Sequence, residues 1–186
     1  DFIKKYDIIT SVIHTPEDYQ ELTYNYLKEC AVDNVIYVEA MISSTHAKLK
    51  GMDYHSLLEG VTKGAKQAEQ EFGIISKYIM NGIRHLGPDS VYETAHEVIN
   101  NLHPDLVGFG LAGDELHFPP KLFVKTFNML KENNFPITIH AGEWDGPERI
   151  REAIELLHPM RLGHGVRSIE DPGLVSLIRD LDIVLE

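Results

Sequence analysis

Short apolar runs rich in β-branched residues alternate with longer amphipathic stretches along the whole chain. Runs such as Leu-Val-Gly-Phe-Gly-Leu at 106–111 and Ile-Thr-Ile-His at 137–140 are short, rich in apolar or β-branched residues and close to turn residues, which is typical of buried strands. Between these two runs, Phe123, Phe127 and Leu130 recur at helical spacing and predict the core face of a helix. The pattern predicts strands at 35–39, 74–80, 106–111, 137–140, 161–164 and 183–186, and helices at 15–30, 53–72, 88–100, 119–133, 147–157 and 169–181.

Six strand–helix periods imply an α/β fold with a parallel sheet. Histidine and acidic residues gather where the strands end, as a site on the carboxyl-terminal face of a (β/α)₈ barrel requires. An open, doubly wound sheet is the alternative, but no glycine-rich phosphate turn follows the first strand. Six strands do not close an eight-stranded barrel, which typically takes about 250 residues. We therefore predict that residues 1–186 form a single domain, the central portion of a partial TIM (β/α)₈ barrel in a longer protein.

Composition narrows the class of function. A formal charge of −12 opposes binding to nucleic acid, since phosphates would be repelled, but it is compatible with a small neutral or cationic substrate. A single cysteine, Cys30, rules out an internal disulfide and a thiolate zinc cluster and fits a reducing cytosol. No apolar run approaches the roughly 20 residues of a membrane span, so we expect a cytoplasmic protein with no membrane partner.

The most informative stretch is His140-Ala-Gly-Glu143, directly after a buried β run. A histidine at a strand end can bind a metal, and a nearby glutamate can shuttle protons to a metal-bound water. The alternative is that His140 only caps its strand by hydrogen bonding. In that case Glu143 would be the first-turn acid of the following helix.

A second histidine, His164, ends the next strand and is flanked by Gly163 and Gly165. It could orient an attacking water or stabilise a charged intermediate, whereas the alternative is a histidine in a simple bend. Gly113-Asp114-Glu115 is a strand-end loop whose glycine N–H could bind a substrate ring nitrogen. Its two acids could form a helix N-terminal pair or orient metal ligands. Arg84 and His85, at another strand end, are weaker candidates to face the pocket.

Four segments together resemble the adenosine deaminase family. They are His140-Ala-Gly-Glu143, Arg161-Leu-Gly-His164-Gly165, Phe109-Gly-Leu-Ala-Gly-Asp-Glu115 and Val35-Ile-Tyr-Val-Glu39. The resemblance implies that His140 is a ligand of one Zn²⁺ per complete barrel and that Glu143 donates a proton to purine N1. It also implies that His164 positions the zinc-bound hydroxide and that the Gly113 amide contacts the purine.

The sequence departs from the family pattern in its metal ligands. The family's first strand carries a His-x-His pair and its last strand an aspartate pair, and neither is found here, so one of four expected protein ligands is present. Met41 and Gly110 also stand where the family often has arginine and aspartate. We expect the 186-residue segment alone to be inactive and to bind zinc poorly. The other barrel segments of the parent chain would be its partners.

The predicted function of the complete protein is zinc-dependent hydrolytic deamination of adenosine, a purine nucleoside, to inosine and ammonia. Deamination of adenine or another aminopurine is the alternative within the same superfamily. A barrel fragment that binds a nucleoside without catalysis is a second alternative, and an amidohydrolase acting on an amide or ester is a third. The absence of GxSxG, P-loop, HExxH and CxxC motifs argues against serine, thiol and nucleotide-triphosphate chemistry.

Overall fold

The computed structural model describes residue 5 and residues 8–186, which fall into two compact units. The first unit comprises Asp1–Ile79 and Asp105–Val107, and the second comprises Met80–Pro104 and Gly108–Glu186. The single domain expected from the sequence stays a prediction.

Six strands are hydrogen-bonded in the order in which they occur along the chain. Neighbours from β3 onward pair in parallel, with Phe109 opposite Ile137 and Leu162 opposite Leu185. Consecutive parallel strands joined by helices are the βα units that the alternating pattern predicts. The strands are β1 (Tyr37–Ile42), β2 (Ile75–Ile83), β3 (Leu106–Ala112), β4 (Ile137–Ala141), β5 (Arg161–His164) and β6 (Val184–Leu185).

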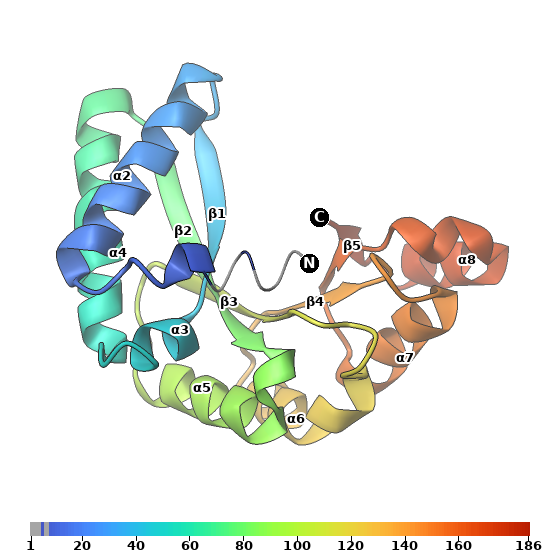
Figure 1. The fold of residues 1–186 in the computed structure, drawn as a ribbon. Coiled ribbons are helices and arrows are strands. Elements are labelled where there is room, and N and C mark those ends of the chain that lie inside the picture. The colour runs from blue at the N-terminus through green and yellow to red at the C-terminus, as the bar shows by residue number, and fades with distance from the viewer. Residues whose placement is uncertain (1–4, 6–7) are drawn as a thin grey trace. The chain divides into compact units, whose positions relative to one another are not determined.

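In the first unit, helices α2 (Pro16–Val32) and α4 (Tyr54–Phe72) lie side by side (Figure 1). Helix α2 begins with a capping box in which the Thr15 hydroxyl accepts from the N–H of Asp18. On α4, a side chain at Gly60 would lie 2.2 Å from the Pro16 carbonyl oxygen, so glycine permits close helix packing. A short helix, α3 (Ser44–Lys48), precedes α4 where the sequence indicates only a loop.

The core of the first unit includes Leu27, Ala68 and Ile74, with the free Cys30 packed against them. Strand β1 begins at Tyr37, two residues later than predicted, and Ile36, which is apolar but 79% exposed, precedes it. Apolar character alone therefore misplaced the start of this strand.

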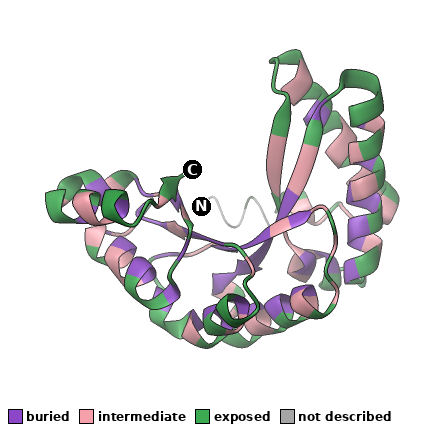
Figure 2. Ribbon diagram, turned by 180° about the vertical axis from the view of Figure 1, so that it is seen from behind, coloured by how far each residue is buried: buried purple, intermediate pink, exposed green. Residues whose placement is uncertain are grey.

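The second unit contains most of β3, all of β4 and β5, and the helices α5 (Pro88–Asn100), α6 (Val124–Glu132), α7 (Pro147–Leu157) and α8 (Pro172–Asp180), of which α6 and α7 contact β4. Figure 2 shows that β3 and β4 are mostly buried, while the helices alternate buried and exposed residues. The predicted core stripe is confirmed, since Phe123, Phe127 and Leu130 are all buried. Phe127 meets Phe109 of β3 edge to face at 6.0 Å between ring centroids.

Two helices of the second unit begin later than predicted. Residues Pro120–Phe123 form a 3₁₀ turn, so that α6 starts at Val124. Helix α8 starts at Pro172 because the Asp171 side chain accepts from the N–H groups of Gly173 and Leu174, capping the helix there.

Helices in the part of the chain that the structure describes fall short of the length and apolar character that crossing a membrane requires. A cytoplasmic location stays a prediction.

Candidate active site

The two strand-end histidines of the second unit lie together. The parallel register places His140 opposite Gly163 and Ala141 opposite His164. The two imidazole rings are 4.8 Å apart between centroids and meet edge to face at 86°. Adjacent strand ends therefore bring together the two residues that the sequence indicates, as expected for parallel βα units.

Gly163 makes room for the ring of His140. A β-carbon at this position would lie 2.5 Å from Cδ2 and 3.0 Å from Nε2 of His140, closer than real contacts allow. Gly163, which precedes His164 on β5, thus leaves space for the imidazole ring of His140 on the neighbouring strand β4. The sequence alone suggests only close approach of a ligand at this glycine.

The environment of His140 keeps its imidazole neutral at physiological pH. Burial is the largest cause that lowers its pKa to about 4, and the nearby His164 and Arg84 lower it further. A neutral imidazole has a lone pair available for a metal ion, whereas a protonated one does not.

Glu143 is the third member of the cluster. Its side chain is 44% exposed, and its Oε2 lies 3.4 Å from Nε2 of His164. Helix α7 begins only at Pro147, so the interpretation of Glu143 as a first-turn acid of that helix is wrong. His164 itself has φ of 67°, a left-handed conformation that is uncommon outside glycine and that tends to cluster at functional sites.

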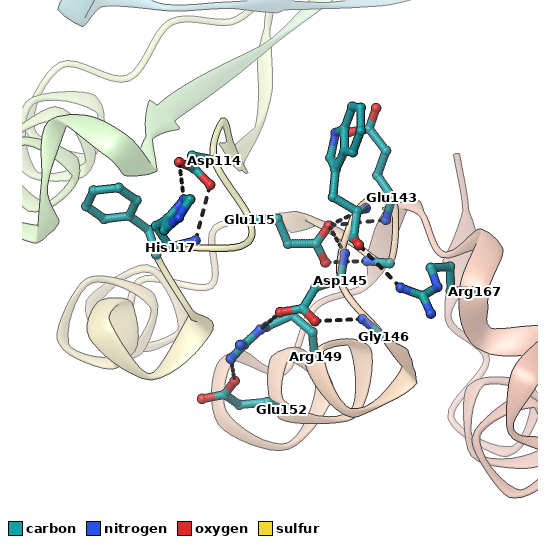
Figure 3. A network of polar contacts seen from close by, with 12 residues as sticks. Asp114, Glu115, His117, Glu143, Asp145, Gly146, Arg149, Glu152 and Arg167 are labelled. Atoms are coloured by element: carbon teal, nitrogen blue, oxygen red, sulfur yellow. Dashed lines mark hydrogen bonds and ion pairs between the residues drawn. The ribbon is translucent and has the colours of Figure 1, made fainter. Parts of the chain in front are cut away.

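A buried carboxylate supports the loop that carries Glu143. Glu115 is 3% exposed, and its Oε1 accepts from the N–H of Gly142 at 2.5 Å. Its Oε2 accepts from the N–H groups of Glu143 at 3.2 Å, Trp144 at 3.0 Å and Asp145 at 3.4 Å (Figure 3). One side chain therefore satisfies four consecutive backbone donors in a loop that belongs to neither a strand nor a helix.

The neighbouring acid has a different role. Asp114 Oδ2 lies 2.8 Å from Nδ1 of His117, and Asp114 Oδ1 accepts from the N–H of the same residue (Figure 3). The next helical turn starts at Pro120, so Asp114 and Glu115 are not an acidic pair at a helix N-terminus. The other alternative, that an acid of this loop orients metal ligands, stays a prediction, because the hydrogen bonds of Glu115 go to the backbone of residues 142–145.

The buried Arg84 side chain connects the ends of neighbouring strands through hydrogen bonds. Its side chain is fully buried, and its guanidinium donates to the carbonyl oxygens of His140 at 2.6 Å, Phe118 at 3.4 Å and Leu111 at 3.5 Å. Burial lowers the pKa of Arg84 to about 10, and the nearby Glu115 charge opposes that shift. The idea that Arg84 faces the pocket is wrong, because its side chain is buried and its guanidinium group donates to backbone carbonyl oxygens.

Gly113 follows β3 with φ of 105°, in the region that favours glycine. A β-carbon here would lie 2.7 Å from Nδ1 of His85, so the turn also needs glycine for space. The turn leads directly into Glu115, which places this loop beside the loop of Glu143.

Glu39, which the family resemblance includes, lies on β1 in the first unit. It is half-buried, and its Oε1 accepts from the Tyr37 hydroxyl at 2.8 Å.

The family model described as adenosine deaminase matches residues 1–186, the whole of the sequence. The chain belongs to the adenosine deaminase family. Members of this family are hydrolases. The strand order, together with the similarity to solved structures, establishes a partial (β/α)₈ barrel.

The chain is similar to proteins named adenine deaminase. It is 40% identical to one from Chelativorans sp. (strain BNC1) over 185 residues, which are 100% of this chain and 57% of that protein. The crystal structure of adenine deaminase from Arthrobacter aurescens superposes with a TM-score of 0.91 at 27% identity, over 99% of this chain and 56% of that one. The chain thus spans little more than half the length of the relatives that it matches.

A zinc-containing structure is also similar. An amidohydrolase from Burkholderia ambifaria with bound zinc superposes with a TM-score of 0.88 at 27% identity, over 93% of this chain and 48% of that one. In the present chain, residues 5 and 8–186 do not bring three or more histidine, cysteine, aspartate or glutamate side chains into a metal-binding group. The neutral, half-buried His140, with space kept for its ring by Gly163, fits one position of such a site.

Proposed function

We propose that the complete protein is a zinc-dependent hydrolase that deaminates an aminopurine, and adenine is the substrate that we favour. The observation that carries the proposal is the cluster of His140, His164 and Glu143 at two neighbouring strand ends. This cluster combines a neutral imidazole, a second imidazole and an exposed carboxylate, which is a set suited to metal-assisted hydrolysis with proton transfer.

His140 would hold the zinc together with ligands from elsewhere in the complete protein, because structural and catalytic zinc sites use three or more protein ligands. When bound, the ion supplies a water that is nucleophilic at neutral pH. The carbonyl oxygen of His140 is fixed by Arg84 and its ring by the space at Gly163. These contacts orient the imidazole before any metal arrives.

The remaining roles concern protons. Glu143 donates a proton to a purine ring nitrogen while water adds to the adjacent carbon that bears the amino group. His164, with its Nε2 3.4 Å from Glu143, orients the water and holds its proton. The proton held by His164 then passes to the amino group, which leaves as ammonia, while the added hydroxyl returns a proton to Glu143 and becomes a carbonyl, so adenine and water give hypoxanthine and ammonia. The Gly113 N–H would bind the purine ring from the neighbouring loop.

The relatives favour adenine over adenosine. The relative at 40% identity and the structure at a TM-score of 0.91 are both named adenine deaminase. Adenosine is the second candidate, because the matching family model is described as adenosine deaminase. The two substrates differ by a ribose, so a site that encloses the bare base would exclude the nucleoside.

An ammonia-release assay on the complete gene product tests the proposal. We expect turnover of adenine, a much lower rate with adenosine and about one zinc per chain by metal analysis. Faster turnover of adenosine would favour the second candidate. Zinc-free protein that binds a purine without releasing ammonia would contradict the enzymatic function altogether.

Replacing Gly163 by alanine should weaken zinc binding by about 10- to 100-fold, the effect typical of residues that orient a ligand. The new methyl group would collide with the His140 ring and turn it away. Gly146→Ala is the matched control, since a methyl group there meets only the flexible end of Glu148. Zinc titration of both variants measures the difference, and equal affinities would show that Gly163 does not set the ring.

A further inference from the structure

Glu115 joins the two loops that carry the candidate substrate contact and the candidate proton donor. It lies two residues after Gly113, and its carboxylate accepts from the four N–H groups of Gly142 to Asp145 (Figure 3). We propose that Glu115 is a positioning residue, which sets the place of Glu143 by holding the backbone of this loop. The inference rests on the proposed function of Glu143 as proton donor.

The loop requires a carboxylate. Strand β4 ends at Ala141 and α7 begins at Pro147, so the donors between them are not satisfied by regular structure. Consecutive N–H groups that converge on one point form an anion-binding concavity, and an ionised carboxylate can accept at both oxygens. A glutamine would present an NH₂ group, itself a donor, to part of this concavity. The hydrogen bonds to an ionised group are also stronger than neutral ones.

The charge of Glu115 is compensated within the same unit. The buried Arg84 guanidinium interacts favourably with the Glu115 charge, although its hydrogen bonds go to backbone carbonyls. Burial of an uncompensated carboxylate would be costly, so four N–H donors and a nearby cation explain why the acid is tolerated at 3% exposure. Arg84 and Glu115 therefore support the same segment, residues 140–145. Arg84 binds the carbonyl oxygen of His140, and Glu115 binds the N–H groups of residues 142–145.

Glu143 depends on this support because its own side chain is poorly enclosed. With 44% of the side chain exposed and its carboxylate 3.4 Å from His164, packing contributes little to its position. The backbone of residue 143 then decides where the carboxylate lies. A displacement of about 1 Å at a catalytic group can cost up to 100-fold in rate.

A double-mutant cycle in the complete, zinc-loaded enzyme tests the inference. Glu115→Gln is expected to lower kcat about 10- to 100-fold and to change KM and zinc content little. In a Glu143→Gln background, the same substitution should change the rate by less than about twofold, the usual scatter of independent effects. Such non-additivity is expected if Glu115 acts through Glu143, whereas a general loss of structure would lower both backgrounds alike.

The matched control is Glu155→Gln, which removes the same charge from an exposed position of α7 and should leave kcat unchanged. If Glu115→Gln does not fold, Glu115→Asp takes its place, because it keeps an acceptor-only carboxylate but withdraws it by one methylene. If the wild-type enzyme is active and the losses from the two substitutions are additive, the positioning role of Glu115 is overturned while the proposed function stands. A zinc-loaded wild-type protein that deaminates no aminopurine would overturn the proposed function, and the inference with it.

Discussion

Glu143→Gln in the complete protein is expected to lower adenine turnover by about 10²- to 10⁴-fold, the usual contribution of a general acid or base. Glutamine keeps the size of the side chain and its place in the loop, because the Glu143 N–H remains bound to Glu115. It removes the ionisable proton that the ring nitrogen needs. Zinc content should stay near normal, since His140 is unchanged. Steady-state ammonia release and metal analysis on the same preparation measure both effects.

Glu148→Gln provides the control for this prediction. Glu148 lies five residues further along, exposed in the first turn of α7, and its replacement removes the same charge. A helix N-terminal acid is worth only about 0.3–1 kcal/mol through the helix dipole, so turnover should be close to that of the wild type. If Glu143→Gln were as active as this control, Glu143 would have no part in proton transfer.

The fold was predictable from the sequence because its elements carry strong local signals. Helix α7 matches its predicted bounds, since Pro147 opens it and apolar residues recur on its inner face. Asp53, where the helix 53–72 was predicted to begin, is the residue whose side chain caps α4. Errors arose where local signals are weak or compete. The five-residue α3 is too short for any periodicity, and Ile36 is apolar but exposed.

For the candidate site, the proximity of its central residues was predictable from the sequence, whereas the contacts that hold its loop in place were not. His140, Glu143 and His164 follow two consecutive strands, and the parallel register makes their proximity a consequence of strand order. The bonds of Glu115 to residues 142–145 span 27 to 30 positions and depend on how two loops pack. No sequence period encodes such pairing. The only signal for it in the sequence was an acid two residues after Gly113 in a strand-end loop.

Arg84 is where we expect the largest effect on stability. Its replacement by methionine keeps an apolar stem of similar length but leaves buried carbonyl oxygens of His140, Leu111 and Phe118 without this donor. Loss of a charged donor to buried acceptors typically costs about 2–4 kcal/mol in the free energy of unfolding. For a protein of this size, that corresponds to a fall of about 5–15 °C in Tm.

Thermal unfolding followed by circular dichroism measures this effect, with Arg179→Met as the control. Arg179 is 74% exposed and pairs with the adjacent Asp180 at the surface, where ion pairs contribute little. Its Tm should equal that of the wild type. An Arg84→Met protein with the same Tm would mean that the buried guanidinium only compensates its own desolvation. A large fall would instead identify Arg84 as the group that fixes the carboxyl end of β4, and through the carbonyl of His140 the first part of the site.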